Sequence, residues 1–393
     1  MNRVEVPVAY LDNAATTAML PEALEVLSRE AATVGNASSL HGAGRRARKV
    51  VEESREKLAA AVGAKPQEII FTASGTEANN LAVKGMYWQG LKQGKVRDSI
   101  CSSPIEHHAI LDPLEWLERE HNATLRLAEV DGDGVTKLES IAQIFSDHAA
   151  TISFATVMHS NNEVGALQPV AEIAAIAREY QIPTHTDAVQ SFGKVPIDFG
   201  KLGVDAMTVS AHKIGGPLGV AALVAKKNLE LTPILHGGGQ EREVRSGTLH
   251  TPAIAAFATA AELAQVRLHE NSARVRELRE LLIAGIMAVV PDVRLNGGAN
   301  TLPGIAHFTF AGAEGDALLL LLDAQGVQCS TGSACSAGIA QPSHVLLAMG
   351  LAPKVARSSI RFSIGPTTGK AEVERAIAVI GEVVSRARAA GVK

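Results

Sequence analysis

Lys213 is the residue whose surroundings most strongly indicate covalent chemistry. It follows a β-type run at 206–210, lies beside Ser210 and His212 in sequence, and precedes an Ile-Gly-Gly segment. A lysine amine must be neutral to attack an aldehyde, and local burial lowers its pKa. Most lysines are solvated surface charges, but this hydroxyl and imidazole setting favours a lysine that forms a Schiff base with an aldehyde cofactor.

A carboxylate and a carboxamide end another β-type run at 184–186. Asp187 follows this run directly, and Gln190 comes three residues later. A pyridine nitrogen becomes a good electron sink when it is protonated, and a buried carboxylate such as Asp187 would hold that proton. Gln190 could donate a hydrogen bond to a phenolic oxygen on the ring. The alternative is that Asp187 is an ordinary strand-end cap.

A third strand-to-helix junction, at 71–78, is typical of a phosphate site. Gly75 and Thr76 open a helix after a tight turn, where backbone N–H groups and hydroxyls can bind an anion. The alternative is N-capping by Ser74 with a capping box to Glu77. The two interpretations are compatible.

Cys335 lies in a run of small residues, 330–338, that has neither helical nor strand periodicity. We expect a flexible, exposed loop there, which suits a nucleophile that must approach a cofactor and then leave it. Cys329 and Cys101 lie in β-type patterns and are expected to be buried packing residues. A metal site built from Cys329, Cys335 and His344 lacks the usual paired spacing, so no metal is predicted.

The elements around these residues predict an α/β fold. Strands that alternate with helices favour a mostly parallel sheet covered on both faces, with ligands at the carboxyl ends of the strands. A helix is predicted at 42–62, a long helical stretch with possible breaks at about 252–290, and later β-type runs at 305–310 and 359–364. The strands of the main sheet are expected at 68–72, 99–102, 124–130, 151–157, 184–186, 206–210 and 219–224.

Composition limits the class of protein. A chain of 393 residues is long enough for two domains, and 46% hydrophobic residues can build the core of each. The charge is balanced, with 37 Lys and Arg against 41 Asp and Glu, so nucleic acid is not expected as a direct partner. The N-terminus lacks the apolar run of a signal peptide, and no stretch is long enough to span a bilayer. We therefore expect a cytoplasmic protein without a membrane partner, whose three cysteines remain thiols.

A series of motifs in fixed order resembles the NifS/IscS-type cysteine desulfurases, within the class V aminotransferase branch of fold type I pyridoxal-phosphate enzymes. The resemblance covers nearly the whole chain, from about Tyr10 to Gly365. One departure is Ala37, where the family has a proline, which affects the shape of the loop at 35–39. The motifs are YLDNAATT, TASGTEANNLAVKG, IEHHAILD, MHSNNEVG, HTDAVQSFGKVPID, SAHKIGGPLG, HGGGQEREVRSGTLH, STGSACSAGIAQPSHVLLAMG and SSIRFSIG.

The resemblance implies a role for each site residue. Lys213 would bind pyridoxal 5'-phosphate covalently, Asp187 would pair with the pyridinium, and His107 would stack on the ring. Asn162 would contact the phenolic oxygen and the substrate, and Arg361 would grip the substrate carboxylate. From the residues alone, a helix-start role for His107 stays open. The remaining cofactor ligands would be Gln190 at the phenolic oxygen and Gly75, Thr76, Ser210, His212 and, from a second subunit, Thr248 at the phosphate.

The implied reaction is cysteine desulfuration. L-cysteine would give L-alanine and a persulfide on Cys335, with Lys213 removing the Cα proton and His107 as a proton shuttle. The sulfur would pass to acceptors such as an iron–sulfur scaffold or a tRNA-thiolating enzyme, and Cys335 as a transient cluster ligand stays open. Alternatives are a selenocysteine lyase, a class V aminotransferase and a non-catalytic docking scaffold.

The resemblance also predicts the domain organisation. Residues 14–265 would form a large cofactor-binding domain with a seven-stranded sheet. Residues 1–13 and 266–393 would form a smaller α+β domain, which carries the mobile Cys335 loop at about 328–342. Thr248 would complete the phosphate site of a neighbouring subunit, so the protein is expected to be a homodimer.

Overall fold

The large sheet provides the edge on which the predicted site residues meet. The structure is a computed structural model, which describes residues 8–92, 97–332 and 341–391. The sheet has the order β2-β8-β7-β6-β5-β3-β4, and within it only β8 runs antiparallel to its neighbours. The mostly parallel α/β prediction is therefore confirmed. The strands are β2 (Ile69–Thr72), β3 (Ser99–Ser102), β4 (Thr124–Leu127), β5 (Ile152–Thr156), β6 (Thr184–Asp187), β7 (Ala206–Ser210) and β8 (Ala221–Ala225).

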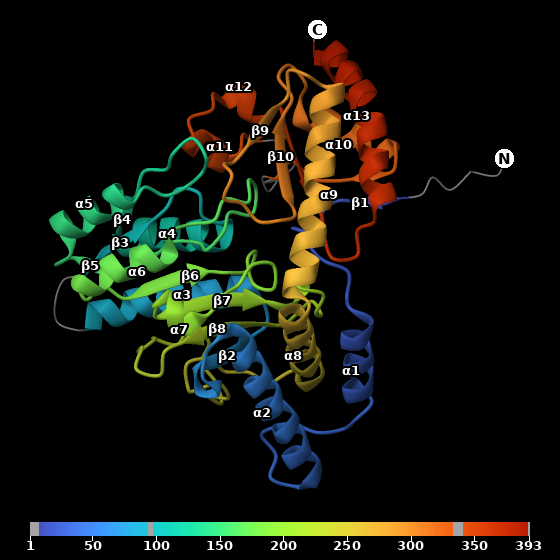
Figure 1. Cartoon of the computed structure of the whole chain (residues 1–393). Helices are drawn as coiled ribbons and strands as arrows, with labels where there is room; N and C mark the ends of the chain where they lie inside the picture. Colours follow the sequence, from blue (N-terminus) through green and yellow to red (C-terminus); the bar gives the residue numbers. More distant parts are fainter. Residues whose placement is uncertain (1–7, 93–96, 333–340, 392–393) are drawn as a thin grey trace.

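Helices cover both faces of this sheet (Figure 1). Alternate strand residues point to opposite faces, so Ile70 packs with α3 and α4, whereas Ile69 and Phe71 pack with α2 and α8. At β3 and β5, helices α5 and α6 cover one face of the sheet and pack on Cys101 of β3 and Ala155 of β5. The helices are α1 (Pro21–Ala31), α2 (Gly42–Val62), α3 (Gly75–Lys92), α4 (His108–His121), α5 (Leu138–His148), α6 (Val170–Glu179), α7 (Phe199–Leu202) and α8 (Thr251–Val266).

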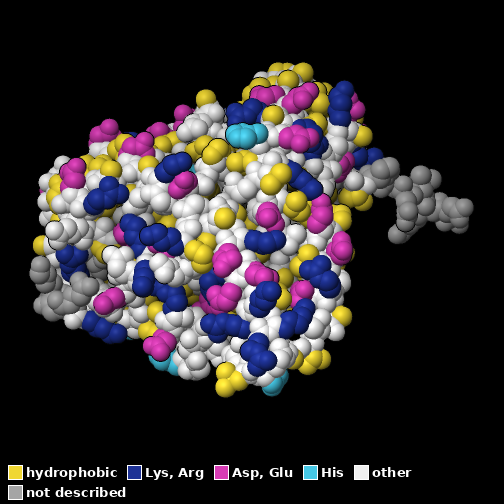
Figure 2. Space-filling model, turned by 60° about the horizontal axis from the view of Figure 1, so that its bottom comes forward, with side chains coloured by type: hydrophobic (Ala, Val, Ile, Leu, Met, Phe, Trp, Pro, Cys, Tyr) yellow, Lys and Arg dark blue, Asp and Glu magenta, His cyan; other side chains and the backbone are white. Residues whose placement is uncertain are grey.

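Helix α2 matches its predicted range of 42–62. It ends at Gly63, whose φ of 68° is the left-handed conformation that glycine adopts without a steric penalty. A Cβ at this position would also lie 2.7 Å from Cγ of Asp198. The exposed side of α2 carries ion pairs such as Arg48–Glu52, and charges of both signs are intermixed over this face of the molecule (Figure 2).

A second group of elements packs beside the large sheet. The predicted helical stretch at 252–290 is broken at Arg267, where α8 ends and α9 (Leu268–Val289) begins. Helix α9 and α13 (Lys370–Gly391) pack together against a hydrophobic cluster that includes Phe308 and Phe362. The cluster also covers a three-stranded antiparallel sheet of order β12-β10-β9, made of β9 (Arg294–Asn296), β10 (Ile305–Thr309) and β12 (Ser359–Ser363).

The remaining elements connect these two groups. A short parallel pair joins β1 (Ala9–Tyr10) to β11 (Val327–Gln328), which places the N-terminal strand among the C-terminal elements. The helices here are α10 (Gly315–Ala324), α11 (His344–Ala348) and α12 (Pro353–Ala356). The division at 13/14 and 265/266 remains a prediction. The separate hydrophobic clusters on the two sides of Arg267 support it.

Strand β4 is shorter than the predicted run at 124–130. It ends at Leu127, and Val130 forms only an isolated bridge to Thr136. The physical reason is its position at the edge of the sheet. Among the described strands, β4 pairs only with β3, and the last bond of this edge is from the Ala128 N–H to the Ser102 carbonyl.

Among the helices of the described ranges, none combines the length and apolar character needed to cross a bilayer.

Candidate active site

The amine of Lys213 lies at the carboxyl edge of the sheet. A short 3₁₀ turn, Ala211–Lys213, follows β7 and turns this side chain toward the segment after β1, where Nζ donates to the carbonyls of Ala14 (2.7 Å) and Ala15 (2.8 Å). Burial lowers the pKa of Lys213 to about 8, and the charge of Arg361 adds to this effect while Asp187 opposes it. The amine is therefore easier to deprotonate than an ordinary lysine.

Asp187 lies at the end of β6, buried, with its carboxylate held on two sides. Asn79 Nδ2 donates to Oδ2 at 2.7 Å, and the Val189 N–H donates to Oδ1 at 2.9 Å. An ionised carboxylate offers about four acceptor positions, so lone pairs remain for one more donor. This arrangement fits a partner for a pyridinium N–H.

The start of α3 packs against the end of β7. A Cβ at Gly75 would lie 3.2 Å from Cγ2 of Val189 and 3.7 Å from Cβ of Ser210, so glycine allows this close approach. Ser74 Oγ accepts from Glu77 N–H at 3.1 Å, which confirms the predicted cap. The first N–H groups of a helix lack intrahelical acceptors, so Gly75 and Thr76 remain suited to bind an anion there.

His212 belongs to the same edge. Its Nδ1 lies 3.3 Å from Thr16 Oγ1. Burial lowers the pKa of His212 to about 4, and the neighbouring charges of Lys213 and Lys194 act in the same direction. The imidazole is therefore neutral near pH 7 and can bind a phosphate as a hydrogen-bond donor rather than as a cation.

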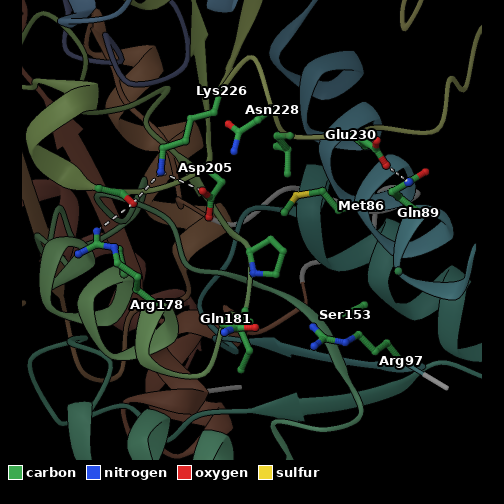
Figure 3. Close-up of a pocket in the computed structure, with 16 residues that line it drawn as sticks. Met86, Gln89, Arg97, Ser153, Arg178, Gln181, Asp205, Lys226, Asn228 and Glu230 are labelled. Carbon is green, nitrogen blue, oxygen red and sulfur yellow. Dashed lines mark hydrogen bonds and ion pairs between the residues drawn. The ribbon is translucent and has the colours of Figure 1, made fainter. Parts of the chain in front are cut away.

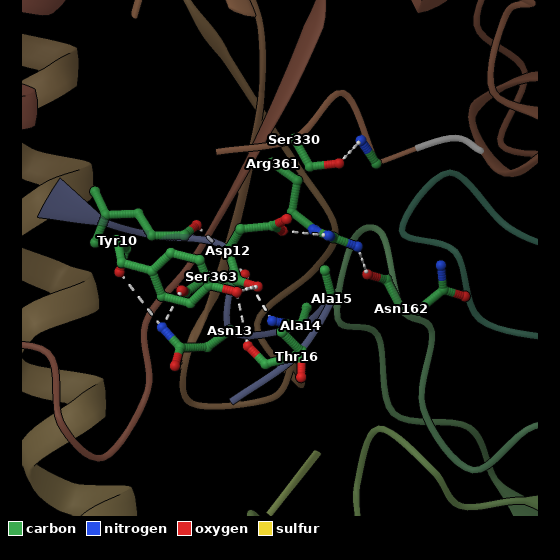
Figure 4. Close-up of polar contacts among 12 residues, drawn as sticks. Tyr10, Asp12, Asn13, Ala14, Ala15, Thr16, Asn162, Ser330, Arg361 and Ser363 are labelled. Carbon is green, nitrogen blue, oxygen red and sulfur yellow. Dashed lines mark hydrogen bonds and ion pairs between the residues drawn. The ribbon is translucent and has the colours of Figure 1, made fainter. Parts of the chain in front are cut away.

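Arg361 is the centre of a buried polar cluster (Figure 4). It is 4% exposed, Nη1 donates to the Asn162 carbonyl at 2.8 Å, and Nη2 pairs with Asp12 Oδ1 at 2.7 Å. Within the described part of the chain, Arg361 Nε and Asn162 Oδ1 are buried without a hydrogen-bond partner. Buried polar groups are normally paired. Two unpaired atoms in residues that are hydrogen bonded to each other therefore favour a ligand site.

His107 is the N-cap of α4, as the helix-start interpretation expects. Its Nδ1 accepts from the Ala109 N–H at 3.0 Å, so a neutral ring carries its proton on Nε2. Desolvation lowers the pKa of His107; the charge of Asp187 opposes this shift and that of Lys213 adds to it. The helix-capping role leaves Nε2–H available as a donor, so it does not exclude a role in the site.

The two described cysteines are packing residues, as predicted. Cys101 and Cys329 are buried, and burial raises the pKa of the Cys101 thiol to about 12 and raises that of Cys329 as well. Neither forms a thiolate near neutral pH, so neither suits a nucleophile. Cys335 and most of the predicted loop lie outside the described residues. Thr248 is exposed, and its predicted role toward a second subunit remains a prediction.

Four further residues hold the site together and were not predicted from the sequence. Asn79 holds Asp187, Asp12 pairs with Arg361, and Lys194 donates to Gln190 Oε1 at 3.0 Å. The fourth, Glu163, is 1% exposed and accepts from Ser343 Oγ. Each of the four lies within one of the motifs quoted above, so a polar side chain in a matched motif was the signal that could have found it. The spacing of residues along the chain does not say which of these side chains meet in the fold.

A cavity of about 670 Å³ lies at the opposite, amino-terminal edge of the sheet. It is lined by Ser153, Asp205, Lys226 and Arg178, and its Lys226–Asp205 ion pair is 2.9 Å long (Figure 3). It contains no predicted site residue. The predicted residues meet instead at the carboxyl edge, where open α/β sheets bind their ligands.

The residues at the carboxyl edge fit pyridoxal phosphate. The desolvated amine of Lys213 matches the aldehyde of that group. The buried carboxylate of Asp187, with its free lone pairs, matches the pyridine nitrogen, and the helix start against Ser210 matches the phosphate. The fold and this edge define a fold type I pyridoxal-phosphate enzyme.

The family comparison agrees with this class. The family described as Aminotransferase class-V matches residues 9–376, and the chain belongs to it.

Curated relatives cover almost the whole chain. An IscS-like cysteine desulfurase from Mycobacterium tuberculosis is 48% identical over 97% of this chain and 98% of its own length. Cysteine desulfurase IscS from Dictyoglomus turgidum is 40% identical over 96% of this chain and 95% of its own length.

Solved structures give the same fold. A NifS-like protein has a TM-score of 0.88 at 33% identity, covering 96% of this chain and all of that one. The structure of SspA in complex with cysteine has a TM-score of 0.79 at 33% identity, covering 92% of this chain and all of its own.

Proposed function

We propose that Cys335 is the sulfur acceptor of this pyridoxal-phosphate-dependent cysteine desulfurase, which converts L-cysteine to L-alanine. One observation carries the assignment. Ser330, three residues before the segment that is not described, exchanges two backbone hydrogen bonds with Arg361, at 3.2 and 2.7 Å. The chain therefore enters the Cys335 segment beside the arginine proposed to hold the substrate. The buried, high-pKa thiols of Cys101 and Cys329 also support this assignment.

The described residues support a division of labour around the substrate. When bound, pyridoxal phosphate would supply an aldehyde for the substrate amine and an electron sink for the substrate Cα. Arg361 holds the carboxylate through Nε, its unpaired donor, while Asp12 fixes the orientation of the guanidinium. Lys213, whose pKa is lowered to about 8, would take the Cα proton through the neutral form of its amine, which is more populated than in an ordinary lysine. Asp187 keeps the pyridine nitrogen protonated.

The sulfur step needs one thiolate and one proton donor. The Cys335 thiolate attacks the substrate sulfur, an S–S bond forms, and the C–S bond breaks with its electron pair left on the carbon side. His107 is the residue that we assign as the proton shuttle for this cleavage; its Nδ1 accepts from the Ala109 N–H, which leaves Nε2 as the ring nitrogen through which a proton would move. The products are a Cys335 persulfide and, after protonation of the carbon, alanine.

The destination of the sulfur is a further part of the proposal. The persulfide passes to an acceptor protein such as an iron–sulfur scaffold or a tRNA-thiolating enzyme, in the cytoplasm. The active unit is a homodimer in which Thr248 reaches the phosphate site of the partner, and the exposed position of Thr248 supports this arrangement. The function of the relatives supports the sulfur-transfer chemistry, with L-cysteine as substrate.

The test compares two cysteine variants. Cys335→Ala should keep the cofactor spectrum, because Lys213 and Asp187 are unchanged, but it should lose persulfide formation and catalytic alanine release. Cys329→Ala is the matched control, which should retain turnover and lose stability because it removes a buried side chain. Near-normal desulfuration by Cys335→Ala would refute the assignment. Product analysis separates the alternatives, since a selenocysteine lyase would release selenide and an aminotransferase a keto acid.

A further inference from the structure

Gln190 lies between the Lys213 amine and a second half-buried lysine, Lys194. Its Nε2 donates to the Ala14 carbonyl at 2.8 Å, and the same carbonyl accepts from Lys213 Nζ at 2.7 Å. On the other side, Gln190 Oε1 accepts from Lys194 Nζ at 3.0 Å. The amide of Gln190 is thus part of a continuous hydrogen-bonded chain from Lys194 to Lys213.

The position of Lys194 is fixed by its backbone. Gly193 has a φ of 71°, and a Cβ there would lie 2.8 Å from Cγ2 of Ile214, so the turn is tight and close to its neighbours. The Lys194 N–H donates to the Ser191 carbonyl, and the Lys194 carbonyl accepts from Ser272 Oγ of α9 at 2.7 Å. This turn places the Lys194 side chain within hydrogen-bonding distance of Gln190. The bond from Ser272 also joins Lys194 to α9, the helix that begins after Arg267.

The hydrogen-bonding chemistry of Lys194 sets which way the amide of Gln190 faces. An ammonium has donors and no acceptor, so the amide oxygen must point toward it and the amide nitrogen away from it. Burial and the charges of Lys213 and Arg361 lower the pKa of Lys194 to about 7, so Lys194 fixes the amide most firmly below that pH, where it is an ammonium. Among the described side chains, Gln190 Oε1 is the acceptor recorded for Lys194 Nζ.

The chemistry of pyridoxal phosphate makes this orientation important. Its phenolic oxygen is on the ring carbon next to the one that bears the aldehyde, and the aldehyde joins Lys213. A donor on the side of Gln190 that faces Lys213 is therefore a donor toward that oxygen. We infer that Lys194 is a positioning residue, which holds Gln190 with its amide nitrogen toward the phenolic oxygen of the cofactor. The inference rests on the proposed attachment of the cofactor to Lys213.

The test is a pH titration of the cofactor chromophore in the holoenzyme, with no substrate present. A donor to the phenolic oxygen favours its ionised form, so Gln190→Leu should raise the pKa of the chromophore by about one unit, the size expected of one net hydrogen bond. Lys194→Met should raise it by a similar amount. The double variant should shift no further than either single variant, because both act through the same hydrogen bond.

Two controls separate this inference from the proposed function. Lys227→Met removes an exposed lysine elsewhere and should leave the titration unchanged. The wild-type protein must carry its cofactor on Lys213 and release alanine from L-cysteine, and failure there contradicts the proposed function itself. With those controls satisfied, an unshifted titration in Lys194→Met overturns the inference. An additive shift in the double variant also overturns it, since Lys194 would then act through its charge independently of Gln190.

Discussion

The lowered pKa of Lys213 predicts how fast the cofactor-free protein takes up pyridoxal phosphate. Only the neutral amine attacks the aldehyde. With the ordinary lysine pKa of 10.5, about 0.1% of the amine would be neutral at pH 7.5; with a pKa of about 8, roughly a quarter is neutral. Burial therefore raises the reactive fraction by a factor of about 250 at that pH.

The assay is stopped-flow absorbance after mixing cofactor-free protein with pyridoxal phosphate at a series of pH values. The rate should rise about tenfold per pH unit below 8, because deprotonation creates the reactive amine, and it should level off above about 9. Arg361→Gln should move the midpoint to higher pH, since the charge of Arg361 lowers the pKa of Lys213, and Asp187→Asn should move it to lower pH. Lys213→Arg is the control for covalent attachment and should show none.

A wild-type rate that still climbs steeply at pH 10, as it would for a solvated lysine, would refute the lowered pKa of Lys213. An unchanged midpoint in Arg361→Gln would refute the contribution of Arg361 to that pKa. The first result would mean that the carboxyl edge does not desolvate the Lys213 amine as its surroundings in the structure indicate.

Three further predictions concern the dimer, the substrate and the core. Mixing Lys213→Ala subunits with Thr248→Ala subunits should recover activity after subunit exchange. In a mixed dimer, one of the two sites has both its own Lys213 and the Thr248 of the other subunit unchanged. If exchange is proven and no activity returns, the site is not shared between subunits. Arg361→Lys should raise KM for L-cysteine about 10- to 100-fold with an unchanged cofactor spectrum, and an unchanged KM would remove its carboxylate role. Phe308→Ala should lower the free energy of unfolding by about 3–5 kcal/mol in chemical denaturation, because Phe308 is fully buried against Phe362.

Local signals in the sequence were sufficient for the elements. The α2 helix was predictable at both ends, because its apolar periodicity and Gly63 are properties of neighbouring residues. The strands β3 and β7 matched their predicted ranges for the same reason. Strand β4 did not, because its length depends on how many partners it has at the edge of the sheet, which its own residues do not record.

The sequence by itself also determined the chemical types at the site: a lysine after one strand, a carboxylate after another and a helix start rich in small residues. Parallel strands meet at one edge, so these three could be expected together. Only the tertiary structure decided which side chains support them. Asn79 holds Asp187 across 108 positions of sequence, and Asp12 holds Arg361 across 349. Such pairs depend on the packing of whole elements against one another, and that information is not contained in local spacing.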